Sequence, residues 1–488
     1  MKNRRDFLKT TFGAGLGLAA TAFGAASPPP KKRPNFIFFI TDDISPEDLG
    51  CYGNRVIKTP NIDALAKKGV RFTNSYLSIS SCSPTRCSII TGRYPHNTGA
   101  AELHTPLPGG HVLFPKLLKD AGYYTVMSGK NHMGTKVFPA FDTISRGKGP
   151  GMEEDWVEIL QNRPKNKPFF CWFGSYDAHR KWTKTKEGTD YDPEKIKVPP
   201  YLYDGPRTRQ DLADYYHEVS RTDYYLGQLY QELVKQGVAD NTYLIYCSDN
   251  GRPFPRCKTR LYDSGIKTPL IIAGPKAKKG SISNSLVSVI DLSATILELA
   301  QVTKPASIQG VSFAKVLNKP SAKVRDYVFA EHNWHVFQAH ERMVRWDKWL
   351  YIRNAWPQRQ NLCVEGANTD FMPAASELWQ AEAEGKLKPQ QRDIFMVPRP
   401  AEELYNVAKD PHQFNNVADD PKNKKILEKL RAVLNQWSKE TGDTIPENPT
   451  NDRQDANGKE NPNHKRGTMP GTETGATKIN NPGPIREI

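Results

Sequence analysis

Four short, uninterrupted apolar runs constrain the fold of this chain most strongly: Asn35–Ile40, Phe169–Phe173, Thr242–Cys247 and Leu270–Ala273. Runs of this length without polar alternation are typical of strands buried on both faces of a sheet. Helical patterns alternate with them, at Asn61–Lys68, Phe114–Ala121, Gln210–Gln236 and Asp291–Ala300. Alternating strands and helices predict an α/β fold, with a mainly parallel sheet between helices. Functional groups are then expected at the carboxyl ends of the strands.

The pattern changes in the C-terminal third of the chain. Tyr327–Ala330 and Trp349–Arg353 have the composition of short strands, and Asn423–Trp437 is an amphipathic helix. The last residues are rich in Asn, Pro, Gly, Thr and charge, so they should form a surface wrap or be disordered. The expected organisation is a large α/β domain at 35–319, a smaller α+β subdomain at 320–445 and a polar tail at 446–488.

The first 26 residues have the features of an export signal. Arg4 and Arg5 precede a Gly/Ala-rich, weakly apolar stretch, and the twin arginine indicates the Tat route, which exports folded proteins. A retained transmembrane anchor is the alternative, but the stretch has only about 17 residues and includes four glycines. We therefore predict a Tat-type signal peptide at 1–26, a linker at 27–34, recognition by the Tat translocase, a periplasmic or secreted location and no stable membrane anchor.

The formal net charge of the chain is +15, and it remains +12 without the predicted signal peptide. Such a balance indicates an acidic partner, which charge alone cannot identify: nucleic acid, anionic lipid or a sulfated or phosphorylated polymer. The seven cysteines have no CxxC spacing, which argues against both a zinc ribbon and a dense disulfide scaffold.

Acidic and amide side chains follow two of the predicted strands. Asp42 and Asp43 come after the first run, and Asp249 and Asn250 come after Thr242–Cys247. These side chains can converge at one edge of a parallel sheet, and a set of oxygen donors suits Ca²⁺ or Mg²⁺ better than zinc or copper. An Asp pair after a strand also commonly forms a turn or a helix cap, so this pattern alone leaves both interpretations open.

The most specific motif lies in Ser80–Gly99, which reads SSCSPTRCSIITGRYPHNTG. It closely resembles the signature of the type I sulfatases of the alkaline phosphatase superfamily, Cys-x-Pro-x-Arg with a downstream Thr-Gly. In that family the cysteine is oxidised to Cα-formylglycine by a formylglycine-generating or anaerobic sulfatase-maturating enzyme. The resemblance assigns this modification to Cys82, with Pro84 and Arg86 completing the motif, whereas Cys87 lacks the required Pro and Arg.

Further segments resemble the same family in the same order. They are Ala121–Gly134, Pro168–His179, Tyr246–Gly251, Lys258–Leu270 and Glu403–Ala418, the last of which is similar to the C-terminal signature of the family. The resemblance implies an alkaline-phosphatase-like fold and a bound Ca²⁺, with Mg²⁺ the weaker alternative. The implied metal ligands are Asp42, Asp43, Cys82, Asp249 and Asn250. The implied catalytic residues are Cys82, Arg86, Lys130, His132, His179 and Lys258.

The chemistry of the family explains these residue types. Negative charge accumulates on the departing sulfate, and a cation with nearby Lys and Arg stabilises it. Hydrated formylglycine has two hydroxyls: one attacks sulfur, and the other, deprotonated by His132, expels the sulfate and restores the aldehyde. A protonated Lys or His supplies the proton for the leaving oxygen. A serine or cysteine would trap the sulfated intermediate, because it has no second hydroxyl.

Ser248–Pro255 is most similar to the sulfamidase branch, which removes N-sulfo groups from glucosamine. Lys258 stands where that branch has Arg and where O-sulfatases have Lys. We therefore expect a sulfated carbohydrate as substrate, with an O-sulfate ester preferred and an N-sulfo group as the alternative. Substrate contacts are expected from His332, Trp334 and His335, for which surface strand positions are the alternative interpretation.

Two further functions are less well supported. A phosphodiesterase or phosphonate hydrolase of the same superfamily commonly has a Thr or Ser nucleophile and two metals, whereas this chain has C-S-P-T-R and a one-metal pattern. A glycan-binding protein without turnover would explain the basic charge, but it would not need Cys82, Lys130 and the metal ligands. The expected partner is therefore a sulfated oligo- or polysaccharide rather than nucleic acid.

Overall fold

The computed structural model describes residues 33–486, so the predicted signal peptide (1–26) and most of the predicted linker (27–34) lie outside the described residues. Within this range no helix is long and apolar enough to cross a membrane. All seven cysteines fall inside it, and each is a free thiol.

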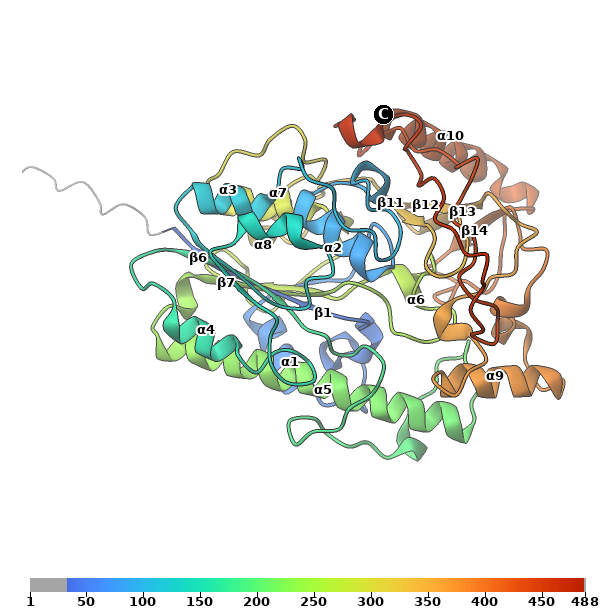
Figure 1. Ribbon diagram of the computed structural model, residues 1–488, viewed down its shortest axis with the longest axis horizontal. Helices are drawn as coiled ribbons and strands as arrows, with labels where there is room; N and C mark the ends of the chain where they lie inside the picture. Colours follow the sequence, from blue (N-terminus) through green and yellow to red (C-terminus); the bar gives the residue numbers. More distant parts are fainter. Residues whose placement is uncertain (1–32, 487–488) are drawn as a thin grey trace, which may run out of the picture. The chain divides into compact units, whose positions relative to one another are not determined.

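An eight-stranded sheet of order β5-β4-β6-β1-β7-β8-β2-β9 forms the centre of the fold (Figure 1). Its strands are β1 (Asn35–Thr41), β2 (Gly69–Phe72), β4 (Tyr124–Gly129), β5 (Thr143–Ser145), β6 (Phe169–Gly174), β7 (Thr242–Ser248), β8 (Leu270–Ala273) and β9 (Ser281–Ser283). Strand β8 is antiparallel to both of its neighbours, and the other pairings in this sheet are parallel. The prediction of a mainly parallel sheet is confirmed.

Helices cover both faces of this sheet (Figure 1). One face carries α2 (Cys82–Thr91), α3 (Phe114–Asp120), α7 (Asp291–Leu299) and α8 (Ala314–Asn318), and the other carries α1 (Pro60–Lys68), α4 (Trp156–Asn162) and α5 (Pro206–Lys235). Side chains of β1 alternate between the two cores: Phe36 and Phe38 pack on the first side, Ile37 and Phe39 on the second. This two-sided burial is why the strand has an uninterrupted apolar sequence.

A second, antiparallel sheet lies in the C-terminal part of the chain. It consists of β11 (Tyr327–His332), β12 (Glu341–Trp346), β13 (Trp349–Asn354) and β14 (Glu402–Asn406), in that order. Helix α10 (Lys424–Thr441) buries Leu430, Leu434 and Trp437 against it. The remaining strands and α-helices of residues 33–486 are β3 (Ser75–Tyr76), β10 (Val287–Ser288), α6 (Asp263–Ile266) and α9 (Pro373–Ala383). The predicted combination of a large α/β part and a smaller C-terminal sheet is confirmed, whereas the boundary at residue 320 stays a prediction.

The polar tail contacts the rest of the fold at several points. Arg93 donates hydrogen bonds to Asn480 Oδ1 (2.9 Å) and to the carbonyl of Ile479 (2.7 Å). The indole of Trp334 donates to the carbonyl of Asn451 (2.8 Å). The described part of the tail therefore runs along the surface of the folded chain.

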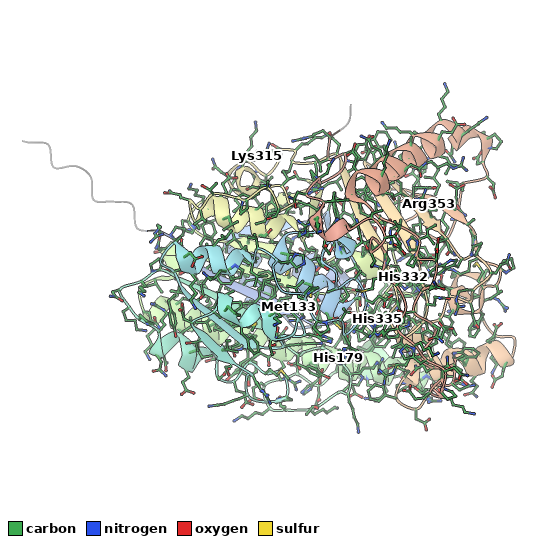
Figure 2. All side chains as sticks on the ribbon, turned by 45° about the horizontal axis from the view of Figure 1, so that its top comes forward. Met133, His179, Lys315, His332, His335 and Arg353 are labelled. Atoms are coloured by element: carbon green, nitrogen blue, oxygen red, sulfur yellow. The ribbon has the colours of Figure 1, made fainter. Side chains whose placement is uncertain are left out.

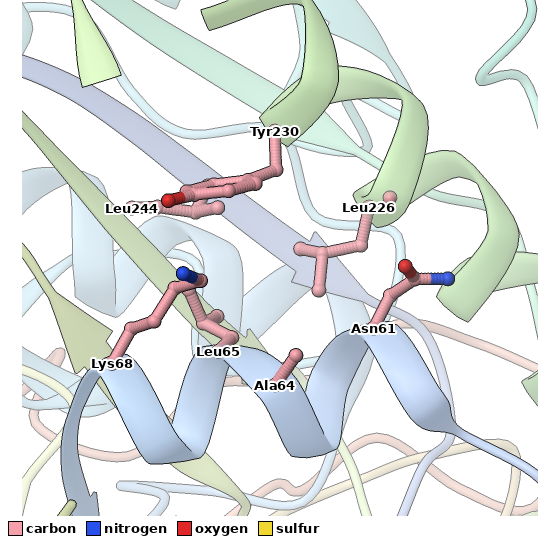
Figure 3. Close-up of a pocket in the computed structure, with 8 residues that line it drawn as sticks. Asn61, Ala64, Leu65, Lys68, Leu226, Tyr230 and Leu244 are labelled. Atoms are coloured by element: carbon pink, nitrogen blue, oxygen red, sulfur yellow. The ribbon is translucent and has the colours of Figure 1, made fainter. Parts of the chain in front are cut away.

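A small cavity of about 40 Å³ lies between α1, α5 and β7 (Figure 3). Its walls are mostly apolar and include Leu65, Leu226 and Leu244. Leu244 lies in the amino-terminal half of β7, away from the carboxyl ends of the strands where functional groups are expected. We therefore interpret this cavity as a gap in the packing of α1 and α5 on β7 rather than as a binding site.

We predict that Arg221→Met lowers the free energy of unfolding by about 3–5 kcal/mol, because it leaves the carboxylate of Asp177 buried without its partner. Arg221 on α5 donates two hydrogen bonds to this carboxylate, at 2.5 and 2.7 Å, and each side chain is 1% exposed. Lys116→Met is the control, because its ion pair with Asp120 is about half exposed and should contribute less than about 1 kcal/mol. Urea unfolding of both variants checks this, and equal losses would contradict it.

Candidate active site

The carboxyl ends of four adjacent strands carry the charged residues singled out in the sequence. Asp42 and Asp43 follow β1, Asp249 follows β7 and Lys130 follows β4. His179 lies in the loop after β6. Since β4, β6, β1 and β7 are parallel neighbours, these residues meet at one edge of the sheet.

Asp42, Asp43, Asp249 and Asn250 form a fully buried cluster of oxygen donors. The amide of Asn250 donates to Asp43 Oδ1 (3.1 Å) and to Asp249 Oδ1 (2.7 Å). A ring nitrogen of His179 and one carboxylate oxygen each from Asp42 and Asp43 lie within 4.8 Å of one another.

Two buried oxygens of this cluster, Asp42 Oδ1 and Asn250 Oδ1, have no hydrogen-bond partner. Buried polar atoms are rarely left unpaired, so these oxygens point to a missing partner. Carboxylate and amide oxygens are the ligands that hard divalent cations prefer. The residues therefore fit the metal implied by the sequence motifs.

Three cationic side chains surround the oxygen cluster. Lys130 Nζ contacts Asp42 Oδ2, Lys258 Nζ lies 2.8 Å from Asp43, and Arg86 Nε donates to Asp249 Oδ2 at 2.7 Å. Burial alone would raise the pKa of Asp42, but Lys130 and the other nearby cations hold it well below its usual range. Burial alone would lower the pKa of Lys258, but Asp43 beside it keeps this pKa well above its usual value. Lys258 is therefore protonated at neutral pH.

Cys82 is the first residue of α2, and Arg86 lies one turn further on the same face of the helix. Pro84 is in the first turn, where its missing N–H breaks no helical hydrogen bond. The helix N-terminus favours negative charge beside Cys82. Burial raises the pKa of the Cys82 thiol to about 11, so the unmodified thiol is neutral and a poor nucleophile at neutral pH. Cys87, on the same helix, is packed in the hydrophobic core against the sheet.

His132 shares a 2.7 Å hydrogen bond between its Nε2 and Nδ1 of His104. Its other ring nitrogen, Nδ1, is buried and has no hydrogen-bond partner. Burial and the charge of Lys130 lower the pKa of His132 to about 2, so the ring is neutral at neutral pH.

His104 was not identified from the sequence, because a single histidine in a loop matches no motif. Its backbone N–H donates to Ser83 Oγ (2.8 Å), the residue after Cys82. His104 is exposed, whereas Cys82 is 3% exposed.

The three residues expected to contact substrate lie in and after β11 and are 3–5% exposed, so they are not surface strand residues. His335 shares a 2.7 Å hydrogen bond with Ser81, the residue before Cys82. Trp334 packs in one small apolar cluster with Cys82 and Leu103. His332 instead pairs with Glu341, at 2.5 Å. Figure 2 shows His179, His332 and His335 in the same part of the molecule.

The sequence profile of the Sulfatase family matches residues 34–147 and 152–302, more than half of the chain. The chain belongs to the sulfatase family. A second profile, N-sulphoglucosamine sulphohydrolase, C-terminal, matches residues 257–354 of this sulfatase. The predicted membership and the predicted similarity to the sulfamidase branch are confirmed, and the protein is a sulfuric ester hydrolase.

Three curated relatives extend this result. Human N-sulphoglucosamine sulphohydrolase is 30% identical over 465 residues, covering 85% of this chain and 91% of its own. An ulvan-active sulfatase of Formosa agariphila is 30% identical over 437 residues, covering 86% and 82%. An N-acetylglucosamine-6-O-sulfatase of Bacteroides thetaiotaomicron is 28% identical over 426 residues, covering 64% and 76%.

Two solved structures share the fold. A protein in complex with its substrate D-glucosamine-2-N,6-O-disulfate superimposes with a TM-score of 0.66 at 22% identity, covering 84% of this chain and 98% of that one. A phosphonate monoester hydrolase of Agrobacterium radiobacter gives 0.63 at 17% identity, covering 85% and 98%. At these identities the likeness shows the fold alone, so the second structure does not argue for phosphorus chemistry.

Proposed function

We propose that this sulfatase releases sulfate from a sulfated carbohydrate, with formylglycine formed from Cys82 as nucleophile and one divalent cation, Ca²⁺, held by Asp42, Asp43, Asp249 and Asn250. The observation that carries the proposal is the position of Cys82 at a helix N-terminus, in the electrostatic environment of Lys130, Lys258 and the carboxylate cluster. The names of the relatives point to sulfated sugars, since they include N-sulphoglucosamine and N-acetylglucosamine 6-O-sulfate.

The divalent cation and formylglycine each supply a defined chemistry. A bound divalent cation withdraws electron density from sulfate oxygens and stabilises the charge that develops on them. Hydrated formylglycine provides two hydroxyls on one carbon, which allows both attack on sulfur and later expulsion of the sulfate.

The side chains of the protein then have separate roles. Arg86, Lys130 and Lys258 neutralise negative charge around the sulfate. His132 is neutral, and its unpartnered Nδ1 is suited to accept the proton of a hydroxyl at residue 82. His104 holds the His132 ring through the hydrogen bond to Nε2. His179, whose pKa burial and the nearby lysines lower to about 3, is also neutral, with Nδ1 held by the carbonyl of Arg180.

The leaving group is proposed to be a sugar hydroxyl. An alkoxide is strongly basic and needs a proton, which the protonated ammonium of Lys258 can provide. A guanidinium at this position would give up a proton far less readily. Lys258 is 2% exposed, so bulk water does not compete at this position.

Removal of an N-sulfo group is the second candidate function. It is favoured by the profile match over residues 257–354, which include Lys258, Trp334 and His335, and by the human relative. Lys258 argues for hydrolysis of an O-sulfate ester, whereas the overall similarity to the sulfamidase branch argues for removal of an N-sulfo group.

Export through the Tat translocase to the periplasm or beyond is also part of the proposal. It rests on Arg4 and Arg5 before a short, Gly/Ala-rich stretch. The partners are then the translocase, a formylglycine-generating or anaerobic sulfatase-maturating enzyme, and the sulfated saccharide.

We predict that Cys82→Ala abolishes turnover and leaves the thermal unfolding temperature nearly unchanged, because it removes the nucleophile but only one sulfur atom of packing. Cys87→Ala, on the same helix, is the matched control and should keep appreciable activity. Mass spectrometry of the peptide spanning Ser80–Arg86 should find formylglycine at position 82 in active protein. Full activity with an unmodified Cys82 thiol would refute the mechanism.

Chelation should inactivate the enzyme, and Ca²⁺ should restore it better than Zn²⁺, because the cluster offers mainly oxygen donors. Asp249→Ala should lose both the bound ion and the rise in unfolding temperature that Ca²⁺ causes. Asp120→Ala, at an exposed carboxylate, should keep both. Elemental analysis of active protein checks this, and stoichiometric zinc without calcium or magnesium would contradict it.

Matched N-sulfo and O-sulfo glucosamine oligosaccharides distinguish the two candidate leaving groups. We expect sulfate release from the O-sulfo substrate, and Lys258→Arg should lower this activity by about 10²-fold or more, because charge remains but the proton donor is lost. Position-resolved product analysis measures it. Release from the N-sulfo substrate alone would overturn the preference for an ester.

A further inference from the structure

The polar tail holds the loop that carries Trp334 and His335. The indole of Trp334 donates to the carbonyl of Asn451 (2.8 Å), and the backbone N–H of Arg453 donates to the carbonyl of Val336 (2.8 Å). The ring of His464 stacks on Trp334, with centroids 5.5 Å apart. Residues 451–466 therefore line the outer side of this loop.

Arg466 has a fixed position over Trp334. Its guanidinium lies 4.1 Å from the centre of the indole ring, donates to the carbonyl of Leu103 (2.6 Å) and contacts Glu102 Oε2 (3.2 Å). Its side chain nevertheless remains 42% exposed. These two contacts use two of its five N–H donors. The guanidinium of Arg466 is thus fixed by these contacts and is accessible to solvent.

The guanidinium of Arg466 is linked to Cys82 through the residues that it contacts. Trp334 and Leu103, two of the residues that Arg466 contacts, pack in the same apolar cluster as Cys82. Arg466 is also close enough to the exposed His104 to lower its pKa, after the larger effect of burial. Arg466 is therefore an exposed cation in contact with the cluster that contains Cys82 and within electrostatic range of His104.

The acidic partner of Arg466 neutralises it only in part. Glu102 is 4% exposed in its side chain and also accepts a hydrogen bond from Thr450 (2.7 Å). Burial raises the pKa of Glu102, while Thr450 and Arg466 oppose this rise. Lys465, also on the tail, is exposed and adds positive charge to the same segment, whereas the exposed Arg453 is paired with Glu460 at 3.4 Å.

We propose that Arg466 binds a second anionic group of the substrate, next to the sulfate that is removed. This inference rests on the proposed function, and it narrows the substrate to a saccharide with at least two anionic groups. The ligand chemistry is an oxyanion, either a second sulfate or a uronate carboxylate. Guanidinium binds both through paired, charge-assisted hydrogen bonds. Arg466 lies outside the profile matches, which end at residue 354, whereas Glu102, Leu103 and Trp334, which it contacts, lie inside them.

The test compares three disaccharides that share one scissile sulfate. The first has no other charge, the second has an additional sulfate, and the third has a uronate carboxylate. We expect Arg466→Gln to reduce the ratio of kcat/KM for a doubly anionic substrate to that for the singly anionic one by about tenfold. Arg466→Lys should give a smaller reduction. The larger loss identifies which of the two oxyanions the subsite takes.

Arg431→Gln is the matched control. Arg431 is also a C-terminal arginine with an acidic partner, Glu402, and its side chain is 44% exposed, but it lies on α10. It should leave all three kcat/KM values unchanged. An equal fall on the three substrates for Arg466→Gln, or no fall on any, would overturn the subsite.

Equilibrium binding separates this inference from the proposed function. In the Cys82→Ala background, Arg466→Gln should weaken binding of a doubly anionic disaccharide by about tenfold relative to Arg431→Gln. If the wild-type protein released no sulfate, the proposed function would fail, while this loss of affinity would still support the subsite. Unchanged affinity would overturn the subsite whether or not sulfate is released.

Discussion

The pairing of buried carboxylates with cationic side chains, away from water, is the constraint on which the rest of the structure depends. Asp42, Asp43 and Asp249 are fully buried, and isolated carboxylates at such positions would cost several kcal/mol each. Parallel pairing of β1 with β7 brings them together, and the ion pairs with Lys130, Lys258 and Arg86 offset much of this cost. The cation that we propose would then bind at a site where folding has already removed the ligands from water.

The sequence predicted best those strands whose two faces are both apolar. Strands β1, β6 and β7 were located within one residue at each end, because nothing polar interrupts them. Strand β4 was missed because it contains buried Thr125 and Ser128, whose hydroxyls bind Asp142 and Asp155. Such polar partners lie outside the strand, so no local pattern reveals them. Strand β8 runs antiparallel to β2 and β7, and this direction depends on pairing that the sequence of β8 alone does not reveal.

Within the site, motif residues could be predicted because local spacing places them. Cys82 and Arg86 are one helical turn apart, and the acidic residues directly follow strands. His104 and Arg466 could not be predicted, because their positions depend on where a loop and a distant tail return in the folded chain. His335 was expected to contact substrate, but its hydrogen bond to Ser81, across more than 250 residues of sequence, could not be predicted.

Trp334 and Arg466, which belong to or contact the cluster around Cys82, are synthesised late in translation. Trp334 follows Cys82 by about 250 residues, and Arg466 is nearer still to the end of the chain. At about 5–20 residues per second, the ribosome needs on the order of ten to fifty seconds between Cys82 and Trp334. The maturating enzyme that we propose would therefore have a time window in which the cysteine is accessible without any unfolding of the finished protein. The late translation of Trp334 and Arg466 would thus delay the burial of Cys82.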